Sequence, residues 1–85
     1  MHDIILAKEI LDEVLKQAKK NKFKRISKVV VSLGKFVEHD EEISPKNLKY
    51  NFQLLAKNTL ANNAKLLVKK IDQPKIWRLE EIEGV

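Results

Sequence analysis

Residues 29–34 read Val-Val-Val-Ser-Leu-Gly, and the fold is decided by this stretch. Three β-branched residues in succession favour a strand, and a continuous apolar run is typical of a strand buried on both faces. We therefore expect a buried strand over residues 27–33, with Gly34 at its end.

The segments on either side of this strand have the pattern of amphipathic helices. Residues 3–20 repeat apolar side chains at helical spacing, with charged side chains between them. These apolar residues are Ala7, Ile10, Leu11, Val14, Leu15 and Ala18. For the second helix, Ser44 is an N-cap, Pro45 occupies the first helical position, and Ile43 can pack against Leu48 as a hydrophobic staple. This second helix is expected to end near Asn58.

Two further strands complete the predicted fold. Residues 65–71 and 76–82 are rich in Leu, Val and Ile, and Asp72-Gln73-Pro74 reverses the chain between them. We expect the third strand to run antiparallel to the second, and residues 35–43 to form a loop. The order helix-strand-helix-strand-strand predicts an α/β (α+β) fold, in which two helices pack on a three-stranded mixed sheet.

Length and composition limit the possible classes of protein. With 85 residues, 44% of them hydrophobic, residues 1–85 form a single domain with a modest core. The chain has no cysteine, which excludes disulfides, thiolate metal sites and cysteine nucleophiles. No signal peptide or membrane-spanning stretch is recognisable, so we expect a cytoplasmic protein. Two glycines and two histidines outside any catalytic spacing give no enzyme motif, and we predict that the protein is not an enzyme.

A basic run has two interpretations. Seven basic residues occur without an intervening acid: Lys16, Lys19, Lys20, Lys22, Lys24, Arg25 and Lys28. They could bind nucleic acid or an acidic partner, or they could be the solvated end of a helix, where cations complement the dipole. We favour the helix end, because only Phe23 offers a ring for base stacking and no nucleic-acid motif is present.

An acidic cluster at Glu38–Glu42 also has two interpretations. Its carboxylates could hold a hard cation, but the cluster lacks the alternation and the glycine of a calcium loop. We therefore favour a solvated acidic loop.

The first three residues, Met1-His2-Asp3, carry the most specific chemistry. The α-amine of Met1, the backbone nitrogen of His2 and its imidazole Nδ1 can enclose a divalent metal in fused chelate rings. A further nitrogen, or an oxygen near Asp3, can complete a square. This geometry favours Ni(II) or Cu(II) over Zn(II), which prefers a tetrahedron.

The chain resembles the HypA/HybF family of hydrogenase maturation nickel chaperones, whose start reads roughly MHE-x-SLA-x-x-IL. Met1-His2-Asp3, Leu6-Ala7 and Ile10-Leu11 correspond to that start, and residues 25–34 correspond to the first strand of the family. Pro45, Leu48, Phe52 and Leu55 resemble the second helix of the family. Thr59 and Ala64-Lys65-Leu66 are similar to its GT-x-x-x-x-A-x-L passage, with Asn58 in place of the glycine. The resemblance covers most of residues 1–71.

The resemblance implies that Met1, His2 and Asp3 bind Ni(II), with His2 as the essential side-chain ligand. It also implies two partners, a hydrogenase maturation GTPase and the precursor of the hydrogenase large subunit. The chain departs from the family in two respects. Asp3 replaces a glutamate, and the zinc module built on two Cys-x-x-Cys pairs is missing, with only residues 72–75 in its place. No zinc is therefore expected.

The leading hypothesis is a nickel metallochaperone or accessory protein for hydrogenase maturation. One alternative is a metal-free adaptor that kept the HypA-like fold and its partner surface. The other is a basic nucleic-acid-binding module at residues 16–28.

Overall fold

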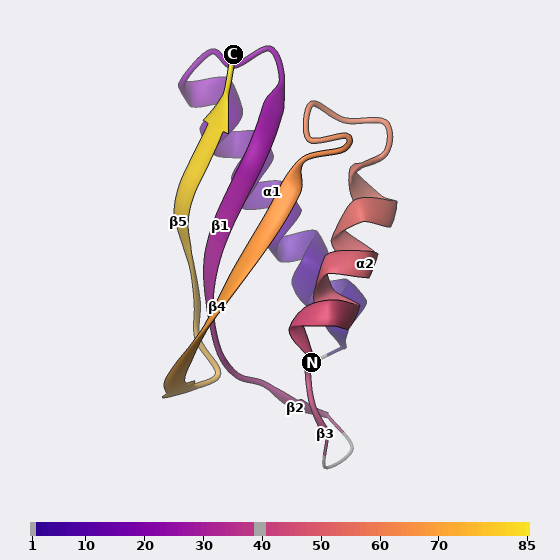
Figure 1. Cartoon of the computed structure of the whole chain (residues 1–85), viewed down its shortest axis with the longest axis vertical. Coiled ribbons are helices and arrows are strands. Elements are labelled where there is room, and N and C mark those ends of the chain that lie inside the picture. The colour runs from indigo at the N-terminus through magenta and orange to yellow at the C-terminus, as the bar shows by residue number, and fades with distance from the viewer. Residues whose placement is uncertain (1, 39–40) are drawn as a thin grey trace.

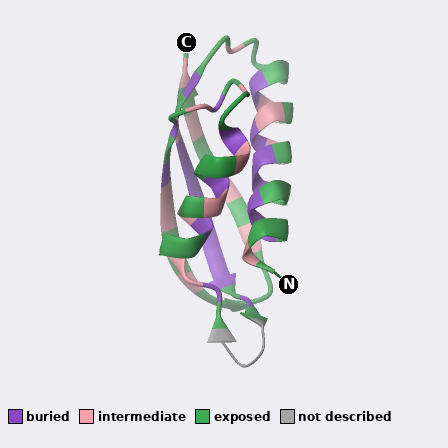
Figure 2. Cartoon of the chain, turned by 90° about the vertical axis from the view of Figure 1, so that its right-hand side faces the viewer, coloured by how far each residue is buried: buried purple, intermediate pink, exposed green. Residues whose placement is uncertain are grey.

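The strand β1 (Ile26–Lys35) is the middle strand of the main sheet. The computed structural model describes residues 2–38 and 41–85. On one side β1 pairs in parallel with β4 (Lys65–Pro74), and on the other it pairs antiparallel with β5 (Trp77–Gly84). The sheet order is β4-β1-β5, and both helices lie on one face of it (Figures 1 and 2). The predicted fold class, a three-stranded mixed sheet with two helices, is confirmed.

The run of valines is buried, as its sequence predicts. Val29, Val31 and Leu33 are each 0% exposed and belong to the core between sheet and helices. Val30 and Ser32 alternate with them and are 5% exposed. Both faces of β1 are therefore covered between residues 29 and 33, although helices cover only one of them.

The first helix, α1 (Asp3–Lys20), has the predicted bounds. Its apolar stripe is buried, with Leu6, Ala7, Ile10, Leu11, Val14 and Ala18 as its members. Lys19 and Lys20 occupy its last turn, where cations complement the negative end of the helix dipole.

The second helix, α2 (Pro45–Ala56), begins as predicted. The Ser44 side chain accepts a hydrogen bond from the Asn47 amide at 3.1 Å, and both Ile43 and Leu48 are buried. The helix ends at Ala56, two residues before the expected Asn58. It packs beside α1 against the sheet (Figure 1).

Two details differ from the expectations. Part of the segment expected to be a loop forms a small two-stranded sheet, β2 (Val37–Glu38) with β3 (Glu41–Glu42). In addition, β5 runs antiparallel to β4 as expected, but its hydrogen-bonded neighbour is β1, because the connection from β4 crosses the end of β1. The turn itself is at Lys75, whose φ is 52°, and not at residues 72–74.

Gly34 does not end the strand, but it makes this crossing possible. Its amide donates to the Ile76 carbonyl at 2.7 Å, and the Lys75 amide donates to the Lys35 carbonyl at 2.9 Å. A Cβ at Gly34 would overlap the Gln73 carbonyl oxygen and lie 2.8 Å from that of Ile76. Only glycine leaves room for the backbone to pass so closely.

We predict that Gly34→Ala destabilises the domain by about 3 kcal/mol, because the added methyl group meets rigid backbone atoms. Urea unfolding measures the change. Lys35→Ala is the matched control at the next position. The exposed Lys35 side chain forms an ion pair with the exposed Asp72, so its loss should cost less than about 1 kcal/mol. If Gly34→Ala and Lys35→Ala had equal free energies of unfolding, the backbone at the crossing would be able to move aside for a methyl group, and the prediction would be wrong.

Candidate metal centre

The predicted metal ligands lie at the start of α1. His2 is the N-cap residue, with extended backbone angles (φ −71°, ψ 146°), and its carbonyl accepts a hydrogen bond from the Leu6 amide at 3.0 Å. Asp3 is the first helical residue and is half-buried. Met1 lies outside the described residues. The structure thus places two of the three predicted residues, His2 and Asp3, at the start of α1.

The first turns of α1 hold this end of the chain in place. Leu6, Ala7 and Ile10 are each 0% exposed, whereas His2 is exposed. Ile4 and Ile5 are 47% and 50% exposed, so two large apolar side chains lie beside the motif. The N-terminus lies at the end of the molecule that carries β2 and β3 (Figures 1 and 2). His2 is therefore presented to solvent by a firmly anchored helix.

The backbone hydrogen bonds of α1 do not involve the first amides of the helix. The hydrogen bonds within α1 begin with the Leu6 amide, so the helix does not use the Asp3 amide as a donor. The half-buried Asp3 carboxylate in the first turn complements the positive end of the helix dipole. The predicted set of nitrogen donors fits a square-planar ion such as Ni(II).

A metal centre made of side chains alone is not found in residues 2–38 and 41–85. There, no three His, Cys, Asp or Glu side chains gather in a way that could hold an ion. In the acidic segment, Glu42 forms an ion pair with Lys70 of β4 at 3.0 Å. The solvated acidic loop predicted at Glu38–Glu42 includes His39 and Asp40, which lie outside the described residues.

The basic run of residues 16–28 includes the exposed last turn of α1, with Lys19 and Lys20. Phe23, the one ring available for stacking, packs against the core instead. Lys28 forms ion pairs with Glu83 at 3.2 Å and with Glu81 at 3.6 Å. Its hydrogen bond to Glu83 and the attraction of both carboxylates raise the pKa of Lys28. In turn, a side-chain hydrogen bond with Glu81, and then Lys28 itself, lower the pKa of Glu83. Phe23 is therefore not presented for base stacking, and Lys28 has acidic partners within the chain.

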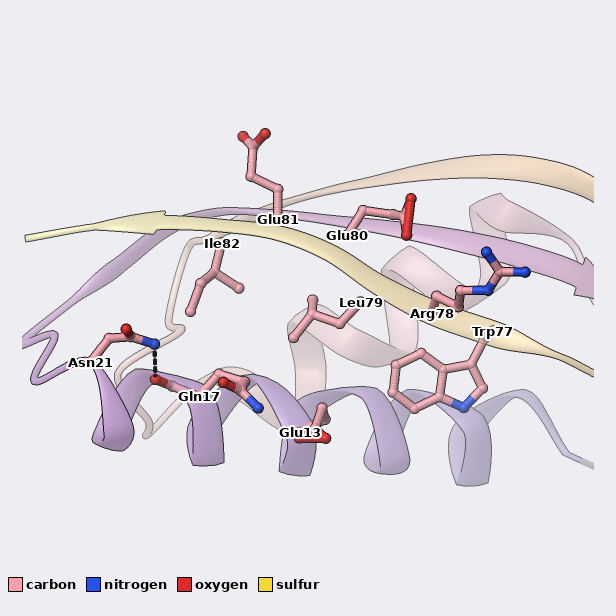
Figure 3. Close-up of a pocket in the computed structure, with 9 residues that line it drawn as sticks. All are labelled: Glu13, Gln17, Asn21, Trp77, Arg78, Leu79, Glu80, Glu81 and Ile82. Atoms are coloured by element: carbon pink, nitrogen blue, oxygen red, sulfur yellow. Dashed lines mark hydrogen bonds between the residues drawn. The ribbon is translucent and has the colours of Figure 1, made fainter.

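A cavity between α1 and β5 was not predicted from the sequence. Its volume is about 720 Å³, and its lining includes Glu13 and Gln17 of α1 together with Trp77 and Leu79 of β5 (Figure 3). These residues are far apart in the chain, and only the pairing of β5 with β1 brings them together. The one available signal was Trp77, the only tryptophan, at the start of a strand.

No helix in the described part of the chain is long and apolar enough to cross a membrane.

The chain matches a known family over most of its length. The family model described as "Hydrogenase/urease nickel incorporation, metallochaperone, hypA" matches residues 1–77. The Hydrogenase maturation factor HypA of Legionella pneumophila (strain Lens) is 31% identical over 71 residues, which are 84% of this chain. That of Caldanaerobacter subterraneus subsp. tengcongensis is 30% identical over 69 residues, or 81% of this chain. The matches span only 59% and 57% of these two relatives.

A solved structure shows the same fold. The solution structure of the Ni metallochaperone HypA from Helicobacter pylori superposes with a TM-score of 0.78 at 16% identity. The superposition covers 100% of this chain and 98% of the other.

We predict that zinc contributes nothing to folding. Structural zinc sites use four protein ligands, commonly thiolate or imidazole, and this chain has no cysteine and two histidines. The melting temperature should therefore be the same with and without a strong chelator such as EDTA. A large fall on adding EDTA would reveal a structural metal.

Proposed function

Because the chain belongs to the HypA family, we propose that it is a nickel metallochaperone that binds Ni(II) through Met1, His2 and Asp3. In this proposal the protein passes the ion to a partner during hydrogenase maturation. The observation that carries it is the exposed His2 at the anchored start of α1, in a chain whose residues 1–77 match the family model. The family model describes a metallochaperone, which agrees with the prediction that the protein is not an enzyme.

The ligand set explains how the ion could be both selected and released. Planar nitrogen donors favour Ni(II) over ions that prefer tetrahedral or octahedral sites. A chelate formed by the terminus has few protein ligands and stays open to an incoming ligand from a partner, since His2 is exposed. This combination suits delivery better than permanent storage.

The proposed partners are a hydrogenase maturation GTPase and the precursor of the hydrogenase large subunit, and the proposed compartment is the cytoplasm. Ile4 and Ile5 support docking beside the metal motif, because burying two half-exposed isoleucines would favour association. Charges on the exposed side of α1, such as Glu9, would then set register and association rate more than affinity.

A second candidate is a metal-free adaptor that kept the family fold. It is favoured by the absence of cysteine from residues 1–85. The two proposals differ in whether the isolated chain binds nickel, so one titration separates them.

We predict one Ni(II) per chain, bound by the terminal chelate. Isothermal titration of Ni(II) into untagged protein should lose its signal in His2→Ala, which lacks the imidazole ligand. An N-terminal extension should have the same effect, because it converts the amine into an amide. His39→Ala is the matched control, since it removes the only other histidine, and it should bind as the wild type does. Full affinity in the extended protein would favour the adaptor or a different site.

We also predict that Ni(II) affinity increases between about pH 6 and 8.5. In model peptides imidazole has a pKa of about 6.5 and an α-amine of about 7.7–8.0, and both groups must lose a proton to coordinate. Protons therefore compete with the metal at low pH, and the ion should leave below about pH 6. Titrations at several pH values measure this dependence. A flat profile would instead indicate carboxylate ligands, for which Glu38–Glu42 is the candidate.

A further inference from the structure

A groove follows α1 along the β5 edge of the sheet. Beside the cavity of about 720 Å³ between these elements lies a second one of about 360 Å³, and Glu13 and Trp77 line both. In Figure 3, Trp77 and Leu79 point from β5 towards α1, with Glu13 below them. We call this combined feature the α1–β5 groove.

The α1–β5 groove is acidic, although the whole chain has a net charge of +5. Its α1 side carries three carboxylates and one cationic side chain, from Glu9, Asp12, Glu13 and Lys16, whereas the side chains of Arg78, Glu80 and Glu81 on β5 do not point towards α1 in Figure 3. Asp12 is paired with Lys8 at 2.8 Å, and Glu81 with Lys28. The acidic excess lies around Glu13, and it would attract a cation.

One carboxylate oxygen of Glu13, Oε2, is buried without a hydrogen-bond donor among the described residues. A carboxylate that has lost part of its hydration gains more from a cationic partner than a fully hydrated one does, because the local dielectric is lower. Since Glu13 also lines both cavities, a ligand in the groove can reach its side chain.

Trp77 supplies the second half of a cation site. Its indole is half-buried, packs against the core and borders both cavities beside Glu13. A cation over an indole face is attracted by the ring quadrupole. Arginine suits this pair better than lysine, since its planar guanidinium can stack on a ring while it donates to a carboxylate.

We propose that the α1–β5 groove is a docking site for a partner protein that inserts an arginine between the Glu13 carboxylate and the Trp77 ring. The partner segment is basic, in keeping with the acidic lining, and its flanking apolar residues cover Leu79 and Ile82. Self-association through β5 is disfavoured by the charge of this strand, which has three glutamates and one arginine. The proposal does not depend on nickel binding.

The test uses the metal-free chain of residues 1–85 and two capped peptides. One has the sequence Thr-Val-Arg-Val-Thr, and the other carries citrulline, the uncharged isostere of arginine, at its centre. NMR titration of ¹⁵N-labelled protein follows the single indole N–H signal, which belongs to Trp77. We expect saturable shifts of this signal with the arginine peptide, and about tenfold weaker binding of the citrulline peptide.

Protein variants then locate the cation contact. Glu13→Gln should lower the affinity for the arginine peptide about tenfold and leave the affinity for the citrulline peptide unchanged. Glu42→Gln, which removes the same charge from β3, should leave both affinities unchanged, and melting curves confirm folding of each variant. Equal binding of the two peptides to the wild type would overturn the proposal. So would wild-type affinity in Glu13→Gln, or shifts confined to residues outside the groove.

Discussion

The close passage of the β4–β5 connection over Gly34 is the constraint on which the sheet depends. β4 and β5 flank β1 on opposite sides, so the chain must cross the end of β1 between them. The hydrogen bonds from Gly34 to Ile76 and from Lys75 to Lys35 secure this crossing. With β5 in place, β1 is paired on both sides, and its valines and Leu33 are shielded from water. Each buried side chain of this size contributes about 1.5–3 kcal/mol, which is a large share of the stability of a small domain.

The parts of the fold that sequence reasoning predicted are those decided by neighbouring residues. The start of α2 depends on Ile43, Ser44, Pro45 and Leu48, which lie within six residues of one another. The bounds of α1 follow from a helical repeat and from lysines in its last turn. In contrast, the strand order was not predictable in detail, because a turn after β4 is equally compatible with a hairpin and with a crossing. What decides between them is the contact of Gly34 with the backbone at Gln73 and Ile76, which no local pattern encodes.

The same distinction applies to the two sites. The terminal chelate could be proposed from the sequence because its donor atoms would come from consecutive residues and would need no tertiary contact. The α1–β5 groove could not, because Glu13 and Trp77 meet only through the pairing of β5 with β1. An irregularity in this pairing also matters. The register shifts between Val30, which pairs with Glu81, and Val31, which pairs with Leu79, so Glu80 has no partner residue on β1. Because of this extra residue, both Leu79 and Ile82 face α1. Strict alternation would have turned one of these two side chains away from the helix.

The crossing also explains how this fold can persist without the zinc module that the family resemblance implies. That module would be inserted at residues 72–75, which is where the chain crosses the end of β1. Here the crossing is closed by backbone hydrogen bonds and by the absence of a side chain at Gly34, neither of which needs a metal. The N-terminus of α1 lies at this same end of the molecule (Figure 1). The strand pairing, and the anchoring of the start of α1 by Leu6 and Ala7, therefore do not require an inserted module at this position.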